Sequence, residues 1–150
     1  MSKRLRTPLL LLGMLTSLCA CAESTPPPAT GNSGYPEHVD LAGQIYRLEN
    51  AGQACVLRKP DQSVLPLDIP SPCHFSVGKD GQAHVETFQD VPIVMVLHVA
   101  PVADNKLECH SQYKAIRLIE GQLEPSVLAQ SASCLRGVGD QKNYTAMFDW

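Results

Sequence analysis

The chain lacks the short motifs that mark the common enzyme classes, and it has few aromatic side chains. Neither Gly-x-Ser-x-Gly nor His-Glu-x-x-His occurs in its 150 residues, and Gly137-x-Gly139 lacks the third glycine of a dinucleotide-binding loop. Aromatic residues make up 5% of the sequence and include one tryptophan. With no motif for a nucleophile, a catalytic acid pair or a cofactor, we expect a protein that is not an enzyme and has no cofactor.

An apolar run of membrane-spanning length is also missing from the N-terminal region. Residues 9–18 are mostly apolar, but this stretch is too short for a transmembrane helix. It follows Lys3, Arg4 and Arg6, and this order of basic and apolar residues is typical of a secretory signal peptide. We therefore expect residues 1–20 to direct export and to be removed.

The predicted signal peptide ends in Leu18, Cys19 and Ala20, and these residues together with Cys21 resemble the lipobox of Gram-negative bacterial lipoprotein precursors. The resemblance implies cleavage before Cys21, a diacylglyceryl thioether on its sulfur and an acylated amino group, enough for stable anchoring in a lipid bilayer. Ala22 follows in place of the aspartate that retains enterobacterial lipoproteins at the inner membrane, which implies the outer membrane, facing the periplasm. The alternative is an ordinary signal peptide with two incidental cysteines.

Residues 21–36 contain this anchor and a stretch rich in Pro, Ser, Thr and Gly, including Pro26, Pro27 and Pro28. Such a composition has no apolar periodicity and predicts a flexible tether. Fully extended, the tether would span about 50 Å. The remaining residues, 37–150, have the length of a single domain.

Basic residues are scarce after the signal peptide. Without residues 1–20 the chain has nine basic and fifteen acidic residues, a formal charge of −6. Nucleic acids and anionic lipid surfaces are bound by clustered Lys and Arg. The composition argues against a nucleic-acid partner and indicates membrane contact through acylated Cys21 alone.

Four cysteines remain after the anchor: Cys55, Cys73, Cys109 and Cys134. An even number in the oxidising periplasm predicts two disulfides, for which three pairings exist. We favour Cys55 with Cys73 and Cys109 with Cys134, because neighbouring segments most easily bring two sulfurs within bonding distance. Neither a C-x-x-C pair nor zinc-finger spacing is present, so we expect no metal site.

Residues 92–99 read Pro-Ile-Val-Met-Val-Leu-His-Val and predict a central strand buried on both faces. A strand of this kind needs cover on two sides. The sequence therefore predicts a mainly β fold, either an antiparallel β-sandwich or a small up-and-down barrel, with two disulfides and one short helix as an option.

Residues 43–59 predict a hairpin. A three-residue loop with Gly52 in the left-handed conformation would place Leu48 opposite Ala54. A helix over residues 37–50, with an apolar stripe on one side, is the alternative.

Residues 73–88 predict a second hairpin, with a three-residue loop that ends at Gly81. A third hairpin is predicted at Glu120-Gly121, after a long strand over residues 107–119. The expected cross-strand pairs are Val77 with Ala83, Phe75 with Val85, Leu118 with Leu123, and Arg117 with Glu124 as an exposed ion pair.

Three further segments are assigned from proline, glycine and apolar content. Residues 60–72 contain four prolines and predict a loop, because proline interrupts a strand ladder. Residues 125–136 begin with proline and precede Gly137, so a short helix is as well supported as a strand. Residues 143–148 predict a final strand.

Histidines form the one chemically suggestive set. On the second hairpin His74, His84 and Glu86 share a face, and this combination has the residue types of a metal site. The simpler interpretation is that they are surface residues with Glu86 as a cross-strand partner, so we predict binding candidates and no metal. His98, within its apolar strand, is expected to make a hydrogen bond.

Tyr35 and Trp150 are candidate recognition residues, because exposed aromatic side chains frequently dominate protein interfaces. The alternative is that each ring packs on the edge of the core.

One wider resemblance lies in residues 41–48, Leu-Ala-Gly-Gln-Ile-Tyr-Arg-Leu, followed by Cys55-Val56-Leu57 and Cys73. These residues resemble the opening of the small periplasmic β-barrel inhibitors of secreted bacterial metalloproteases. The chain differs from that family at Ile45, where the family has tryptophan, in its second cysteine pair, and at Cys21, whose lipidation removes the free amino terminus that those inhibitors use. The resemblance implies the fold class and an inhibitory activity, but not the target.

We therefore expect a lipid-anchored, non-enzymatic module that binds a periplasmic protein, most simply an inhibitor or an immunity-type protein. The acidic charge would suit a basic partner. Two alternatives stay open, namely an accessory lipoprotein of an envelope or secretion assembly, and a carrier of a small ligand or metal.

Overall fold

The computed structural model describes residues 34–150, which lie in one compact unit extending from Gly31 to Trp150. The predicted signal peptide, Cys21 and the tether up to residue 33 lie outside the described residues. No helix within residues 34–150 has the length and hydrophobicity to cross a membrane. The elements are β1 (His38–Leu41), β2 (Gln44–Ala51), β3 (Ala54–Arg58), β4 (Val64–Pro70), β5 (His74–Phe75), β6 (Val85–Phe88), β7 (Val91–Val102), β8 (Asn105–Ile119), β9 (Gln122–Pro125), β10 (Ala129–Ser133) and α1 (Lys142–Thr145).

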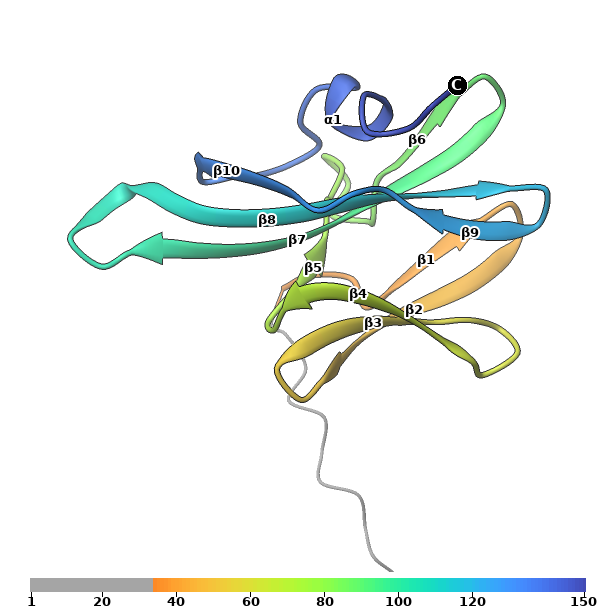
Figure 1. The fold of residues 1–150 in the computed structure, drawn as a ribbon, viewed down its shortest axis with the longest axis horizontal. Coiled ribbons are helices and arrows are strands. Elements are labelled where there is room, and N and C mark those ends of the chain that lie inside the picture. Colours follow the sequence, from red (N-terminus) through yellow and green to blue (C-terminus); the bar gives the residue numbers. More distant parts are fainter. Residues whose placement is uncertain (1–33) are drawn as a thin grey trace, which may run out of the picture. The chain divides into compact units, whose positions relative to one another are not determined.

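The strands form two antiparallel sheets, as Figure 1 shows. The first has the order β1-β2-β3-β4. The second has the order β10-β8-β7-β5, with β6 also paired with β7 and β9 also paired with β8. The long strands β7 and β8 therefore lie at the centre of the second sheet. The mainly β, sandwich-like fold predicted from the sequence is confirmed.

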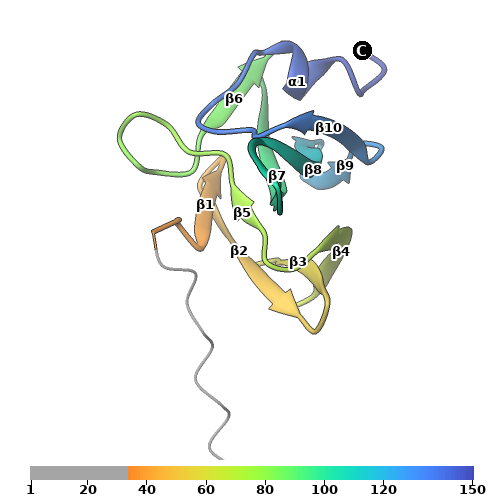
Figure 2. The same ribbon diagram turned by 90° about the vertical axis from the view of Figure 1, so that its left-hand side faces the viewer.

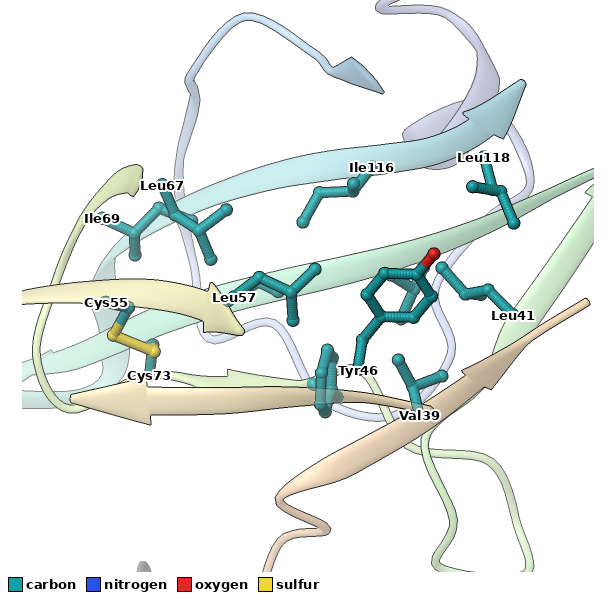
Figure 3. Packing of buried hydrophobic residues seen from close by; sticks show 13 residues of the cluster. Val39, Leu41, Tyr46, Cys55, Leu57, Leu67, Ile69, Cys73, Ile116 and Leu118 are labelled. Atoms are coloured by element: carbon teal, nitrogen blue, oxygen red, sulfur yellow. A yellow bond between two sulfur atoms is a disulfide. The ribbon is translucent and has the colours of Figure 1, made fainter. Parts of the chain in front are cut away.

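The main core lies between the two sheets, where alternate side chains of each strand face inward (Figure 3). Leu41, Leu57, Leu67, Ile69 and Ile116 in this core are fully buried. Burying side chains of this size stabilises the folded state by about 1.5–3 kcal/mol each. The inward-facing residues thus hold the sheets together.

The other face of β7 and β8 is covered by the C-terminal segment, as Figure 2 shows. Ile93, Met95, Leu97 and Ala115 pack there against Tyr144, the buried residue of α1. The prediction that residues 92–99 are buried on both faces is confirmed. The second cover is the helical C-terminal segment, which local patterns around residues 92–99 could not reveal.

The first hairpin has the predicted strands but a different register. Its loop is Gly52-Gln53, with Gly52 at φ +68°, and Leu48 pairs with Leu57 instead of Ala54. A strand register shifted by an odd number of residues turns every side chain to the other face. The predicted register would have pointed Cys55 away from the core. The alternative helix over residues 37–50 is wrong, because these residues form β1 and most of β2.

The proline-rich segment is not a loop throughout, because residues 64–70 form β4. This strand lies at the edge of its sheet, where proline is tolerated since one row of backbone groups has no partner strand. Asp68 has φ +55° and lies where the register with β3 shifts. The prediction failed because it treated the prolines as excluding even an edge strand.

The second hairpin is correct only near its loop. Val77 pairs with Ala83 and Gly81 has φ +77°, as predicted. Phe75, however, pairs with Val96 of β7 and not with Val85. The two strands of this hairpin, β5 and β6, separate and pair one after the other with the same edge of β7. The buried backbone groups along β7 need these hydrogen-bond partners.

The third hairpin has the predicted register, with Leu118 opposite Leu123 and Arg117 opposite Glu124. The guanidinium of Arg117 donates two hydrogen bonds to Glu124, of 3.1 and 2.9 Å. Arg117 is only 8% exposed, so the predicted exposed ion pair is wrong for its cation. Phe148 and Trp150 cover the guanidinium, whose carbon lies 4.6 and 4.8 Å from the two ring centroids.

Of the two alternatives for residues 125–136 the structure has the strand, and the predicted final strand over residues 143–148 is wrong. Residues 129–133 form β10, which pairs with β8, and residues 142–145 form α1. The edge of β8 requires a strand partner, whereas the helical turn at α1 places Tyr144 on the buried face of β7. The Tyr144 hydroxyl donates to the Val138 carbonyl oxygen at 2.7 Å, which fixes the C-terminal segment in place.

Candidate functional site

The paired strands β7 and β8 extend beyond the rest of the second sheet, as the left-hand side of Figure 1 shows. We define residues 98–112 as the arm. β5 pairs with β7 only up to Leu97, so within the described chain the arm has no strand on that side. The register between Pro101 and Val102 shifts, which makes residues 106–108 a bulge near the tip. Leu107 in this bulge is 88% exposed.

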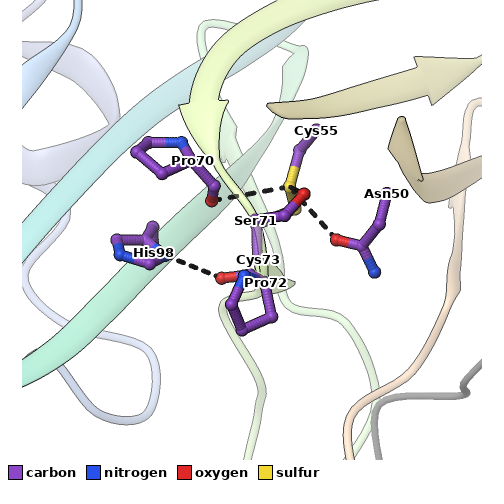
Figure 4. Close-up of a disulfide and its surroundings, with 7 residues drawn as sticks. All are labelled: Asn50, Cys55, Pro70, Ser71, Pro72, Cys73 and His98. Atoms are coloured by element: carbon purple, nitrogen blue, oxygen red, sulfur yellow. Dashed lines mark hydrogen bonds between the residues drawn. A yellow bond between two sulfur atoms is a disulfide. The ribbon is translucent and has the colours of Figure 1, made fainter. Parts of the chain in front are cut away.

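Two disulfides lie at the base and along the side of the arm. Cys109 of the arm is bonded to Cys134, and Cys55 of β3 is bonded to Cys73, which directly precedes β5. Both favoured pairings are confirmed. Figure 4 shows the bridge between Cys55 and Cys73, beside which the imidazole Nδ1 of His98 donates to the Pro72 carbonyl oxygen at 2.8 Å.

A hollow of about 500 Å³, the first hollow, lies beside the base of the arm. Its walls come from four separate parts of the chain: the segment before β1, the connection from β4 to β5 with the first residue of β5, strand β7, and the connection from β10 to α1. The lining residues are Tyr35, Pro72, Cys73, His74, Val99, Leu135 and Arg136.

Tyr35 and His74 form one wall of the first hollow as a stacked pair. Their ring centroids are 3.9 Å apart and their planes differ by 17°. The Nδ1 proton of His74 is donated to the Phe75 carbonyl oxygen at 3.0 Å, which fixes the orientation of the ring. Burial lowers the pKa of His74 below its usual value. The ring is therefore neutral at neutral pH, and the wall is flat and uncharged.

A second hollow of about 530 Å³ lies along the arm, lined by Leu107, Glu108, Ala132, Ser133, Cys134 and Arg136. Arg136 is thus shared by both hollows. Its guanidinium makes no hydrogen bond or ion pair with any residue in the described part of the chain. The two hollows together, which we name the hollow pair, contain one unpaired cation at their junction.

Each disulfide holds a different wall of the hollow pair. His74 directly follows Cys73, and Arg136 lies two residues after Cys134. Cross-linking restricts the motion of both segments, so a ligand bound here would find the walls already in position. The arrangement offers apolar surface, a flat aromatic wall and one positive charge, which is suited to recognition by contact.

The predicted combination of His74, His84 and Glu86 is not formed. His84 and Glu86 lie together, with Nε2 and Oε2 3.3 Å apart, and Gln141 donates to Glu86 at 2.9 Å. These hydrogen bonds, first that of Gln141, lower the pKa of Glu86. His74 lies apart from the pair because β5 and β6 join β7 separately. Within residues 34–150 no three metal-binding side chains converge.

Trp150 is 45% exposed and does not line either hollow. Its indole N–H donates to the Thr145 carbonyl oxygen at 2.8 Å, and its ring meets Phe88 edge-on at 4.8 Å. It packs over Arg117, which agrees with the alternative of an aromatic residue that closes the core. Tyr35, at 42% exposed, is the predicted recognition residue that the structure places at a hollow.

Leu107 and Arg136 are site residues that the sequence interpretation missed. Leu107 is an apolar residue in the polar stretch Asn-Lys-Leu-Glu, directly after a turn, and this isolation was the available signal. Arg136 stands close to a bridging cysteine, as His74 does. Its place at the junction depends on β10, which sequence patterns did not establish.

Comparison of the chain with known protein families, with curated proteins and with solved structures finds no match. The functional argument therefore rests on the residues and the geometry of this chain.

Proposed function

We propose that the chain is an outer-membrane-anchored lipoprotein whose β domain faces the periplasm and binds another protein, as an inhibitor or an immunity-type protein does. The observation that supports this most directly is the arm. It presents Leu107, which is 88% exposed, on a hairpin that the bridge between Cys109 and Cys134 fastens to the segment after β10.

An exposed leucine at the tip of a braced hairpin is a favourable contact residue. Leucine in a partner's pocket would bury most of its side chain, and the apolar gain is about 25 cal/mol per Å². The bridge between Cys109 and Cys134 limits the conformational freedom that the arm would lose on binding. Inhibitors that bind tightly through small interfaces depend on such prepared loops.

The charge of the chain supports a basic partner. Nine basic against fifteen acidic residues remain after the predicted signal peptide. An acidic surface attracts a positively charged protein and raises the association rate, an effect that salt weakens. Anchoring through Cys21 would keep the module at the membrane, and a tether that spans at most about 50 Å when fully extended would let it reach soluble partners.

Affinity capture from a periplasmic extract, with the full chain purified in mild detergent, tests the proposal. We expect one protein to be retained by the wild-type chain and lost with Leu107→Asp, and we expect its enzymatic activity to be inhibited at a one-to-one ratio. Val127→Asp is the matched control, because Val127 is 71% exposed but lies between β9 and β10.

Two other outcomes of the capture experiment would disagree with the proposal. Capture of a secretion or envelope component, with no inhibition, would support the accessory-lipoprotein alternative. Equal retention by wild type and Leu107→Asp would show that the arm is not the contact surface.

A further inference from the structure

Among the described residues that line the first hollow, Arg136 has the only charged side chain, since His74 is neutral at neutral pH. No carboxylate of the described chain pairs with it. Glu108 lines the second hollow, is exposed and makes no ion pair with Arg136. A guanidinium has donors arranged for two parallel hydrogen bonds to a carboxylate. The guanidinium of Arg136 is therefore free to donate hydrogen bonds to a carboxylate of another molecule.

Apart from Arg136, the first hollow is lined mainly by apolar and aromatic side chains. Pro72, Val99 and Leu135 form its sides, and the Tyr35 ring, stacked on His74, forms a flat wall. Its size, about 500 Å³, lies within the range of sites that enclose a bound group. An apolar side chain fits such a space, and a carboxylate next to that side chain would reach Arg136.

We propose that the first hollow binds the C-terminal residue of the partner, an apolar side chain whose α-carboxylate pairs with Arg136. This inference rests on the proposed protein-binding function and names the chemistry of the partner's contact segment. The arm with Leu107 would contact the partner beside it, because Arg136 belongs to both hollows.

N-acetylphenylalanine and N-acetylphenylalaninamide are the probes, because they differ by the carboxylate alone. Titration of the full chain in mild detergent is followed by NMR at the methyl groups of Val99 and Leu135. We expect the acid to bind with a dissociation constant on the order of millimolar, as small ligands of this size do. The amide is expected to bind about five-fold to ten-fold more weakly, because it lacks the charge-assisted pair.

Variants test whether Arg136 causes the difference in affinity between the acid and the amide. Arg136→Gln should reduce binding of the acid to the level of the amide, and Arg136→Lys should restore part of the difference. Glu108→Gln should strengthen binding of the acid about two-fold, because a nearby negative charge is removed. Arg47→Gln is the control, since Arg47 is exposed on β2 and lines neither hollow. It should leave both probes unchanged.

Three results would overturn the inference: equal binding of acid and amide, a preference for the acid that survives in Arg136→Gln, or no response of Val99 and Leu135 to either probe. Its failure can be distinguished from failure of the proposed function. A partner captured through Leu107 and unaffected by Arg136→Gln would leave the function standing and refute the inference. Carboxylate-selective binding without any captured partner would refute the function alone.

Discussion

Arg117 is a buried cation surrounded by a carboxylate, a carbonyl oxygen and two aromatic rings. Besides its pair with Glu124, it donates to the Asp149 carbonyl oxygen at 3.0 Å. Removing one partner of a buried pair is strongly destabilising, although Glu124 is half exposed and can be rehydrated. We expect Arg117→Met to lower the free energy of unfolding by about 2 kcal/mol, measured by urea titration with fluorescence of the single tryptophan.

Arg47→Met is the control for this measurement, because Arg47 is exposed on β2. Surface substitutions usually change stability by less than about 0.5 kcal/mol. An equal loss in both variants would mean that the ion pair and the ring contacts of Arg117 do not stabilise the fold.

His74 gives the fold a dependence on mildly acidic pH. Burial lowers the pKa of His74 from its ordinary value of 6.5. Below that value the unfolded chain binds a proton that the folded chain resists, so stability decreases as the pH falls from 6.5 towards the folded pKa. Unfolding free energies compared at about pH 7.5 and about pH 5.5 should show a smaller decrease in His74→Gln than in wild type.

The matched control is Val127→Gln, which introduces the same residue at an exposed position that has no titratable group. Its pH dependence should equal that of wild type. If His74→Gln also kept the full decrease, burial of the His74 ring would not be its cause.

Individual residues differ in how far the sequence could place them. Cys55 and Cys73 could be paired because they are close in the chain, and the Glu120-Gly121 turn gave the partner of Arg117 from local geometry. The burial of Arg117 could not be foreseen, because its cover comes from Phe148 and Trp150, more than thirty residues away. Contacts of that range leave no local pattern.

Among elements, β10 and α1 show how tertiary pairing overrides local preference. Residues 129–133 carry alanine, glutamine and serine, which no strand scale favours, yet they complete the edge of β8. Residues 143–148 include two aromatic residues and a threonine, which are common in strands, yet residues 142–145 form a helical turn. Long, uniformly apolar elements such as β7 were predictable because burial on both faces has a direct signature in the sequence.

The bridge between Cys109 and Cys134 is expected to stabilise the pairing of β8 with β10. It closes a segment with a separation of 25 residues, for which loop-closure entropy predicts about 3 kcal/mol. Replacing both cysteines by serine should lower the free energy of unfolding by about that amount. Hydrogen exchange should increase in β10 and in the outer part of β8, while β1–β4 keep their protection.

The bridge between Cys55 and Cys73 provides the comparison for this exchange measurement. Replacing Cys55 and Cys73 by serine should instead increase exchange in β3 and β5, because these are the segments it joins. Increased exchange over the same residues in both double variants would show that the two bridges do not act on separate parts of the fold.

For the whole molecule, the sequence established the class of fold but not its layering. Alternating strands and one strand buried on both faces predicted either a sandwich or a small barrel, and the structure has the two packed sheets of the sandwich. The C-terminal segment on the outer face of β7 and β8 was not predicted, because its short helix carries only one buried residue. The hollow pair is likewise lined by segments far apart in the sequence, which include both disulfide-linked segments and β10, and this explains why Arg136 was missed.

The predicted lipid anchor would determine where this molecule acts, and it would depend on one sulfur atom, that of Cys21. Several acyl chains on Cys21 would exceed the roughly two signals needed for stable membrane attachment. We expect the wild-type chain to incorporate labelled palmitate and to sediment with the outer membrane. Cys21→Ala should lose the label, whereas Cys19→Ala should keep both the label and the location.

Mass spectrometry of the mature amino terminus separates this prediction from its alternative. A triacylated Cys21 as the first residue would agree with the lipobox resemblance. An unmodified amino terminus, with palmitate absent from wild type and Cys21→Ala alike, would mean an ordinary secreted protein. The β domain could then bind a partner only by diffusing to it, without the increase in local concentration that a tether to the membrane provides.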